Sequence, residues 1–467
     1  MKPAPHRHKK LLSDLEHEYE RAYPASKAVG DRAARTLVDG GSHAIRLLEP
    51  FPPRIKSARG SYIVTEEGAR ILDFWQGHHA NILGHNPPEI TEPLARLLES
   101  GFGLQTGFTD RLQAETAEIL CDAVGAENAR FTTAGSLATM YAVLLARAYT
   151  GRELVMKIGG GWHGAQPWGL KGVDFHEGKE RFDGVDTEGI PKSVTDQVLI
   201  TRYNDPGMLE ELFARYGNRI ACFIMEPFIG AGGFIAACEE FVTTARELCT
   251  RYGTVLIFDE VISCFRFGPS SAAKLYGIEA DLGTYGKIIG GGMPLSAVAG
   301  RKKIMELCGR GARHPVRFSG GTYSAHPASL YAAKLMMLFL KDHAEDIYPR
   351  IALLGEKMRS GVAREFRKRG ISACCTGEGN SRIPGSSMGM LFFPLGTKAY
   401  IDTPEESQSP EIVDLTLTNR IIPLAMLLEG VHVVHGLGSV SAAHTEEDIR
   451  LLVDACGRAA ERIVSYS

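Results

Sequence analysis

The clearest hydrophobic pattern in the chain is an uninterrupted apolar run that ends in charge. Residues 255–258 read VLIF, and two carboxylates, Asp259 and Glu260, follow directly. A short run of this composition predicts a buried strand. Ligands of α/β sheets sit outside the carboxyl ends of such strands. The pattern therefore places Asp259 at the mouth of a crevice.

Other segments alternate between helical and strand patterns. Residues 11–38 carry helical periodicity with mixed charge and predict an N-terminal arm that packs on another element, with a second subunit as one option. Residues 110–121 predict an amphipathic helix. Residues 61–75 predict a hairpin that turns at Glu67–Gly68. From residue 332 to the end, helix and strand patterns alternate, which favours a smaller α+β lobe.

A lysine among glycines is the strongest candidate for chemistry. Lys287 follows Asp259 by 28 residues, with Gly286 before it and glycines at 290–292 beyond it. Partial desolvation lowers the pKa of an ammonium group and makes the amine a nucleophile. Such a lysine and a carboxylate at a strand end are the minimum for pyridoxal phosphate chemistry. Taken alone, a salt-bridged aspartate and a surface lysine would give the same pattern.

Residues 255–300 resemble the class III aminotransferase family, whose DEV segment and glycine-flanked lysine recur here in order and spacing. The resemblance runs from about Arg46 onward and lies close to the glutamate-1-semialdehyde 2,1-aminomutase branch. It implies pyridoxal-phosphate-dependent transferase fold type I, an α/β fold with a large, mainly parallel sheet and a small α+β domain built from both termini. Lys287 and Asp259 would be the catalytic residues.

The resemblance also implies a division of the chain. Residues 1–105 would form the N-terminal arm and part of the small domain. Residues 106–330 would form the large cofactor-binding domain, and residues 331–467 the C-terminal small domain. The large domain would hold a seven-stranded sheet with helices on both faces.

Two further motifs match the family's cofactor contacts. Gly135 and Ser136 stand where a helix begins, and the N–H groups and positive dipole of a helix N-terminus suit a phosphate. A simple N-capped helix is the alternative, and Leu137 replaces the family's usual glutamate. Trp162 stands before His163 where the family places an aromatic residue that stacks on the pyridine ring. Both motifs make these residues candidate cofactor contacts.

Three more residues complete the expected cofactor site. Glu226 lies in an EP-x-x-G segment, and Val261 belongs to the DEV segment. Thr322 lies in a Gly–Thr–Tyr–Ser turn, and the family uses this threonine to reach the phosphate of the neighbouring subunit's cofactor. A helix-capping turn is the alternative for Thr322. The Asn or Gln that often follows the EP proline is replaced, since the candidate positions hold Ile229 and Ala231.

The substrate contacts are expected in the N-terminal part. GSHAIR at 41–46 resembles a loop that ends, in the aminomutase branch, in a carboxylate-binding arginine, here Arg46. A planar, permanently charged guanidinium suits that role, and a surface arginine is the alternative. Aminomutases place Ser and Trp where this chain has Gly77 and His78. We expect His78 or His79 to form a pocket wall, not a metal site, and whether Arg382 supplements Arg46 stays open.

Composition narrows the classes of partner and compartment. The 467 residues are 44% hydrophobic and 23% charged, with a net charge of −3, so there is no electrostatic case for nucleic acid or an anionic membrane. Nine cysteines without C-x-x-C pairs favour reduced thiols and a cytoplasmic location. No apolar run reaches membrane-spanning length, and the basic start lacks the apolar stretch of a secretion signal.

Together these patterns predict a pyridoxal-phosphate-dependent aminotransferase. It would move an amino group from a carboxylate-bearing amino acid to a keto acid or aldehyde, as a homodimer with active sites at the interface. Intramolecular transfer of the aminomutase type is the first alternative. The changed 77–79 segment, and the absence of a glutamate before the terminal SAAH, argue against it. A racemase or epimerase and a non-catalytic cofactor-binding module are further alternatives.

Overall fold

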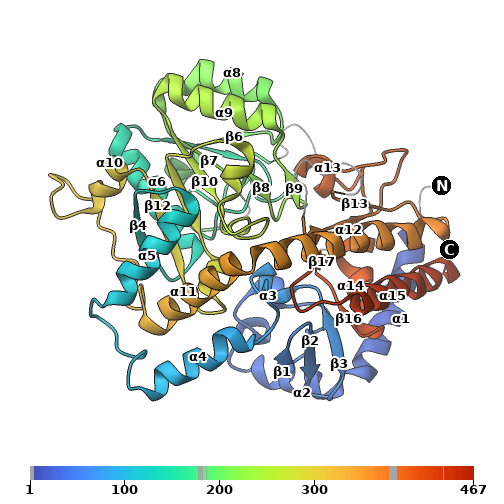
Figure 1. Cartoon of the computed structure of the whole chain (residues 1–467). Helices are drawn as coiled ribbons and strands as arrows, with labels where there is room; N and C mark the ends of the chain where they lie inside the picture. Colours follow the sequence, from blue (N-terminus) through green and yellow to red (C-terminus); the bar gives the residue numbers. More distant parts are fainter. Residues whose placement is uncertain (1–4, 177–181, 186, 378–385, 435, 467) are drawn as a thin grey trace.

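The computed structural model describes residues 5–176, 182–185, 187–377, 386–434 and 436–466 (Figure 1). Its centre is a seven-stranded sheet, in which β12 runs antiparallel to both neighbours and the other neighbouring strands pair in parallel. The mainly parallel sheet of the sequence-based prediction is therefore confirmed. In sheet order the strands are β4 (Asn128–Thr132), β12 (Ser296–Gly300), β11 (Leu282–Tyr285), β10 (Val255–Asp259), β7 (Ile220–Met225), β5 (Leu154–Ile158) and β6 (Val198–Thr201).

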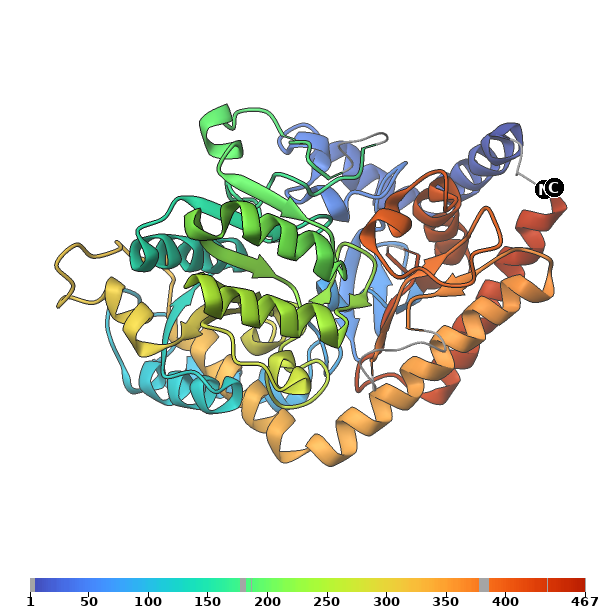
Figure 2. The same ribbon diagram turned by 90° about the horizontal axis from the view of Figure 1, so that it is seen from above.

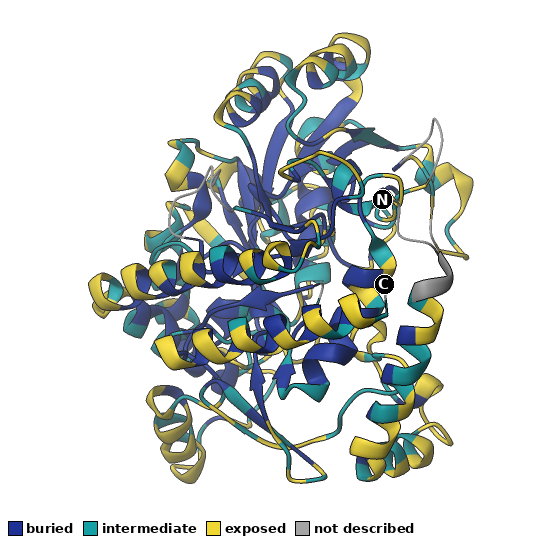
Figure 3. Cartoon of the chain, turned by 90° about the vertical axis from the view of Figure 1, so that its right-hand side faces the viewer, coloured by how far each residue is buried: buried dark blue, intermediate teal, exposed yellow. Residues whose placement is uncertain are grey.

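Helices cover both faces of this sheet because successive side chains of a strand point to opposite sides. Leu256 and Phe258 of β10 belong to a buried cluster with α8 (Pro206–Tyr216) and α9 (Glu239–Tyr252). The residues that alternate with them pack instead against α6 (Gly135–Thr150). Figure 3 shows the strands buried between helices that turn exposed faces outward. The apolar run of β10 is thus covered on both faces of the sheet. Only its carboxyl end, at Asp259, reaches the edge of the sheet.

A smaller lobe joins the two ends of the chain. Its sheet contains β1 (Ile55–Arg59), β2 (Tyr62–Thr65), β3 (Arg70–Asp73) and β16 (Val431–His432), in that order. Strands β2 and β3 form the predicted hairpin, with Gly68 at a φ of 84°. The C-terminal strand β16 pairs in parallel with β3.

Helices from both ends of the chain pack together in this lobe. They are α1 (Pro5–Ala22), α12 (Ala344–Lys368), α14 (Ile422–Leu428) and α15 (Glu446–Ser465). The first and last of these lie side by side (Figure 2), joined by the hydrogen bond from Tyr466 Oη to Asp14 Oδ2 at 2.7 Å. Tyr23, which follows α1, donates to the carbonyl of Leu427 in α14. The N-terminal arm of the prediction therefore packs on the C-terminal helices of its own chain.

The remaining elements connect or cover these two lobes. They are α2 (Pro24–Ala33), α3 (Gln76–His79), α4 (Pro88–Glu99), α5 (Arg111–Val124), α7 (Lys192–Thr195), α10 (Lys302–Met305), α11 (Pro327–Asp342), α13 (Pro404–Gln408), β8 (Phe228–Ile229), β9 (Ile235–Ala236), β13 (Cys374–Cys375), β14 (Met388–Gly389), β15 (Leu391–Phe392), β17 (Gly438–Ser439), η1 (Val38–Gly40), η2 (Ala44–Arg46), η3 (Gly217–Arg219), η4 (Ala272–Tyr276), η5 (Lys287–Gly290), η6 (Glu306–Cys308) and η7 (Leu417–Ile421). The domain limits at 105 and 330 stay a prediction, and the second falls within α11. Within the described ranges, no helix has both the length and the apolar character needed to span a bilayer.

Candidate active site

The candidate site lies at the carboxyl edge of the large sheet. Asp259 ends β10, and Glu226 follows β7, the next strand in the sheet. The turn that carries His163 follows β5, and Lys287 follows β11 after a single glycine. Because these four strands are parallel neighbours, their ends bring the four side chains to one edge. This is the place that the apolar run at 255–258 predicted.

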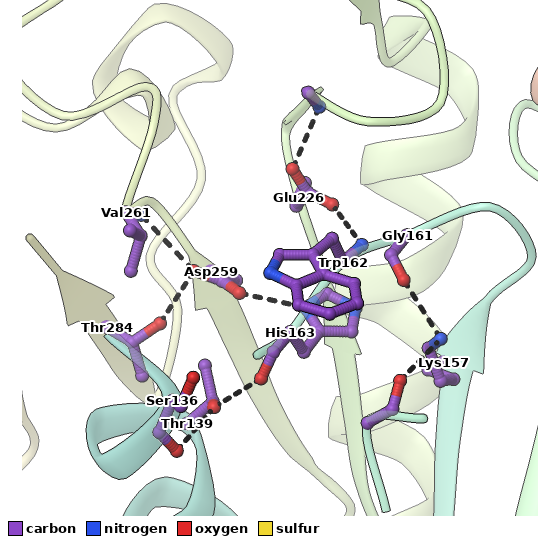
Figure 4. Close-up of polar contacts among 12 residues, drawn as sticks. Ser136, Thr139, Lys157, Gly161, Trp162, His163, Glu226, Asp259, Val261 and Thr284 are labelled. Carbon is purple, nitrogen blue, oxygen red and sulfur yellow. Dashed lines mark hydrogen bonds and ion pairs between the residues drawn. The ribbon is translucent and has the colours of Figure 1, made fainter. Parts of the chain in front are cut away.

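Asp259 is buried and held by three donors (Figure 4). Its Oδ1 accepts hydrogen bonds from Thr284 Oγ1 at 2.9 Å and from the Val261 N–H at 3.2 Å. Its Oδ2 lies 2.8 Å from Nδ1 of His163. Burial lowers the pKa of His163, and although Asp259 opposes this effect, the positive charge of Lys157 adds to it. Asp259 is therefore fixed in one orientation by a largely neutral imidazole, a hydroxyl and a backbone amide.

Lys287 begins η5 in a strained backbone conformation. Its φ is 49°, in the left-handed region that residues other than glycine rarely adopt. Its side chain is partly accessible, but its surroundings are buried. Burial lowers the pKa of Lys287, against the charges of Asp259 and Glu226, and the positive Arg266 lowers it further. Strain together with a lowered lysine pKa is typical of a functional site.

Glu226 links the strand ends to the turn after β5. Its Oε1 accepts the N–H of Trp162 at 3.0 Å, and its Oε2 accepts the N–H of Gly230 at 2.9 Å. Burial, and then the charge of Asp259, raise the pKa of Glu226 to about 8, although the two backbone donors and Lys287 oppose this shift. Glu226 thus holds two loops together beside Asp259.

The turn after β5 packs tightly on the first turn of α6. Gly164 has a φ of 82°, and a Cβ atom there would lie 2.3 Å from Oγ of Ser136, so a larger residue does not fit. The Ala165 N–H donates to Ser136 Oγ at 3.2 Å. Thr139 Oγ1 donates to the carbonyl of His163 at 2.6 Å. These contacts fix His163 beneath Asp259.

The N-terminus of α6 opens toward the same region. Its N-cap residue is Ala134, which has no side-chain hydrogen bond to the first turn. The alternative of a simple side-chain cap is therefore not what the structure has. Val261 packs directly beside Gly135, and the Trp162 side chain is 43% exposed. Gly135, Ser136, Val261 and Trp162 thus surround the Asp259 cluster.

Arg46 and His78 come together from distant parts of the sequence. Arg46 Nε donates to Nε2 of His78 at 3.0 Å. The rings of His43 and Trp75 lie 4.8 and 4.5 Å from the His78 ring. Arg46 is exposed and forms no ion pair with any carboxylate in the part of the chain that the structure describes. Arg382, the other predicted arginine, lies outside the described residues.

The segment that carries His78 is a left-handed turn, which the sequence did not predict. All four residues of α3 have positive φ, at 48°, 60°, 60° and 65°. Asp73 stabilises this costly conformation, since its carboxylate accepts the N–H groups of Trp75 at 3.0 Å and Gln76 at 2.9 Å. His79 at the end of the turn is buried beside Ser439. Of the two tandem histidines, only His78 therefore faces outward toward Arg46.

Arg266 connects this turn to Lys287 and was also missed from the sequence. Its guanidinium is fully buried and donates through Nη2 to the carbonyl of His79. Burial lowers the pKa of Arg266 to about 10. Its charge in turn lowers the pKa of Lys287. The sequence feature that could have indicated a buried arginine is its position between two phenylalanines, at residues 265–267.

Thr322 lies apart from these groups in a surface groove of about 580 Å³, which Phe108, Phe318 and His326 also line. Large apolar side chains are exposed around it, with Leu104 at 76%, Phe108 at 74% and Tyr323 at 62%. Of these three side chains, Phe108 lines the groove, while Leu104 and Tyr323 are the chain neighbours of Gln105 and Thr322, which also line it.

Comparisons with solved structures define the class of protein. An ω-transaminase from Sphaerobacter thermophilus superposes with a TM-score of 0.82 and 29% identity, over 94% of this chain and 98% of that one. A transaminase with bound pyridoxal phosphate gives a TM-score of 0.83 and 27% identity, over 95% and 98%. The fold is that of a pyridoxal-phosphate-dependent enzyme.

The sequence specifies the family. Residues 48–373 match the family Aminotransferase class-III. A glutamate-1-semialdehyde 2,1-aminomutase from Methanoculleus marisnigri is 35% identical over 430 residues, which cover 91% of this chain and 97% of that protein. The chain belongs to the class III aminotransferase family, and the resemblance stated from its motifs is confirmed.

The described residues fit pyridoxal phosphate. A lysine with a lowered pKa faces the same site as a buried carboxylate. His163 Nε2 is buried and has no hydrogen-bond partner among the described residues. The uncapped N-terminus of α6 supplies N–H groups for a phosphate nearby. Amine, acid and anion-binding groups are thus all present at one sheet edge.

Proposed function

We propose that the protein is an intermolecular aminotransferase, which takes an amino group from a carboxylate-bearing amino acid and passes it to a keto acid or aldehyde. The observation that carries this proposal is the Arg46–His78 pair. His78 of this pair lies on α3, the turn that packs against η5, and η5 is the segment of Lys287. A guanidinium without a described carboxylate partner, at the mouth of a site for amine chemistry, suits the carboxylate of a donor.

In this proposal the described cluster holds the cofactor. Lys287 would bind it through its amine, and Asp259 would accept a hydrogen bond from its ring nitrogen. Trp162, supported by His163 and the turn that Glu226 anchors, would contact the ring, and Val261 would be a further contact. Gly135 and Ser136 would hold the phosphate at the N-terminus of α6. When bound, pyridoxal phosphate supplies a conjugated ring that accepts the electron pair left when the donor loses its α-proton.

The chain's own residues then move the proton and orient the donor. Burial lowers the pKa of Lys287, which favours the neutral form of its amine. Once the donor's amine has taken the place of Lys287 on the cofactor, the free Nζ would take the α-proton and later return it. Asp259 is held by three donors and does not reorient during this step. Arg46 fixes the donor's carboxylate, which directs the α-carbon toward Nζ.

The second candidate is intramolecular transfer, supported by the aminomutase similarity at 35% identity. Against it stands the 77–79 segment, where the left-handed turn presents His78 to Arg46. The ω-transaminase similarity favours transfer between two molecules. A racemase would use the same lysine and would produce no carbonyl product.

The proposal is tested by product stoichiometry. Purified holoenzyme is incubated with α-, β- and ω-amino acid donors, with and without a keto acid acceptor. We expect one keto product per aminated acceptor and no sustained turnover without the acceptor. An isomerised product formed without acceptor would establish the aminomutase reaction. Solvent-deuterium uptake without a carbonyl product would establish racemisation.

Removal of Arg46 should act selectively on carboxylate donors. In Arg46→Ala we expect KM for such a donor to rise by about 10- to 100-fold, the effect of losing a charge-assisted pair of hydrogen bonds. KM for an arylalkylamine that lacks a carboxylate should stay near wild type. His78→Ala should raise KM for the carboxylate donor by a smaller factor. This substitution removes only the acceptor of the Arg46 Nε hydrogen bond and leaves the guanidinium in place. Arg59→Ala, at an exposed arginine of β1, is the control. Equal changes for both donors would rule out the role of Arg46.

We propose further that two copies of the chain form a homodimer through the groove of Thr322. The exposed Leu104, Phe108 and Tyr323 support this, because large apolar side chains gathered on a surface typically mark a protein interface. Thr322 would then face the partner's cofactor phosphate. The structure joins no two of the described cysteines in a disulfide, which supports the expected cytoplasmic location.

A further inference from the structure

A buried lysine lies behind the candidate site. Lys157 is the fourth residue of β5, and its side chain has no exposed surface. Its ammonium donates to main-chain carbonyls of the loop that leaves the same strand (Figure 4). The accepting oxygens are those of Gly161 at 3.0 Å, Gly169 at 3.3 Å, Lys171 at 2.8 Å and Gly172 at 3.5 Å.

This arrangement resembles the coordination of a cation by carbonyl oxygens. An ammonium has three donors in a compact group, and four carbonyls at these distances surround it. Burying a charge is costly unless such partners satisfy it, so the loop and Lys157 depend on each other. The loop from 159 to 172 has little regular structure, and its two ends meet at this one ammonium.

The loop carries two of the proposed cofactor contacts. Trp162 and His163 directly follow Gly161, the first carbonyl that Lys157 holds. The same ammonium acts on the imidazole through space, since its positive charge helps to lower the pKa of His163. Two other residues also hold this turn: Glu226 accepts the N–H of Trp162, and Thr139 donates to the carbonyl of His163. Lys157 is therefore the inner anchor of the turn that faces the cofactor.

We infer that Lys157 is a positioning residue, a built-in cation that shapes the 159–172 loop and so presents Trp162 and His163 to the cofactor. The inference rests on the proposed roles of those two residues. It has a chemical consequence of its own. When the lysine side chain is truncated, the carbonyl oxygens around its ammonium form a site for a monovalent cation of similar size, such as potassium or ammonium.

The first test removes the charge and keeps most of the length of the side chain. In Lys157→Met, we expect the dissociation constant of pyridoxal phosphate to rise roughly 10- to 100-fold, in line with the cost of displaced binding groups. Amide hydrogen exchange of the 159–167 peptide in the apoprotein should become faster, a readout that needs no bound cofactor. Wild-type values of both quantities in a folded Lys157→Met protein overturn the inference.

Lys171→Met is the matched control. Lys171 also has a mostly buried ammonium in this loop, but it donates to Thr195 and Val198 and pairs with Asp183. It holds the far end of the loop against the neighbourhood of β6. We expect cofactor retention and exchange of the 159–167 peptide to stay near wild type. A loss equal to that of Lys157→Met would mean that any anchor of the loop matters, and it would overturn the specific role of Lys157.

The second test uses Lys157→Ala refolded in chloride salts, and it decides the matter if Lys157→Met does not fold. Potassium or ammonium at about 0.1 M should restore pyridoxal phosphate binding at least several-fold relative to choline, which is too large for the carbonyl site. Wild-type protein should bind equally in all three salts. Identical binding by Lys157→Ala in the three salts overturns the inference.

Failure of this inference can be told apart from failure of the proposed cofactor contacts. If Trp162→Ala and His163→Ala retain the cofactor as wild type does, those contacts are wrong, whatever Lys157 does. If both variants lose the cofactor but Lys157→Met does not, only the role of Lys157 is wrong.

Discussion

Lys287→Ala should lose transamination by at least about 10⁴-fold, the largest effect expected of any single substitution in this protein. Two proposed functions would disappear together, since Nζ is proposed both to bind the cofactor and to move the donor's α-proton. No neighbouring group replaces them, because Asp259 is occupied by three donors and Arg266 is directed at the turn of His79. The measurement is a single-turnover assay of keto product with a carboxylate donor.

The alanine variant should still fold and bind pyridoxal phosphate without a covalent bond. Asp259, Trp162 and the N-terminus of α6 remain in place, and the strained backbone at residue 287 is already part of the fold. Lys274→Ala, at an exposed lysine of η4, is the control and should keep wild-type activity. A Lys287→Ala protein that retains more than about one-tenth of wild-type activity would refute the role of the amine.

Asp259→Asn should lower kcat by about 10²- to 10⁴-fold with the fold intact. The amide keeps an oxygen for Thr284 and Val261, but its NH₂ group meets the Nδ1–H of His163, which is a donor. The variant also lacks the negative charge that, in the proposed mechanism, keeps the cofactor's ring nitrogen protonated. The measurement is kcat at saturating pyridoxal phosphate, with the donor varied to separate kcat from KM.

The control for this substitution is another buried carboxylate of the same sheet. Asp281 accepts from the Leu256 N–H and pairs with Arg246 and Arg301, away from the site. Asp281→Asn should reduce thermal stability and leave kcat within about threefold, because it removes structural ion pairs only. If Asp259→Asn also left kcat within that range, Asp259 would have no part in the chemistry.

The sheet edge, and the placement of Asp259 and Lys287 at it, could be predicted from the sequence because local patterns determine them. An apolar run that ends in charge implies a strand end, and Gly286 with the glycines at 290–292 isolates Lys287. The hairpin at Glu67–Gly68 was predictable for the same reason, since its turn chemistry is local. These features depend on neighbours in sequence, so one sequence was enough.

The α3 turn could not be predicted in this way. Four consecutive positive φ angles are unfavourable for any local sequence of this composition, and distant contacts impose them. Asp73 holds the start of the turn, and Arg266 binds the carbonyl at its end. Neither partner can be inferred from residues 76–79. The pairing of Arg46 with His78 follows from this turn and was equally hidden.

Lys157 illustrates a different limit. A single lysine in the otherwise apolar run 154–158 stands out in the sequence, but the partners of its ammonium described above are main-chain carbonyls, which carry no sequence signal. Only the path of the 159–172 loop brings those oxygens together. Tertiary structure, not residue type, therefore gives this lysine its environment.

The most direct test of the whole account is to reduce the holoenzyme with borohydride and to map the modified peptides by mass spectrometry. Reduction makes the bond between the cofactor and its lysine permanent. We expect a pyridoxyl group on Lys287, with Lys157 and Lys171 unmodified. A pyridoxyl group on another lysine, or none at position 287, would contradict it.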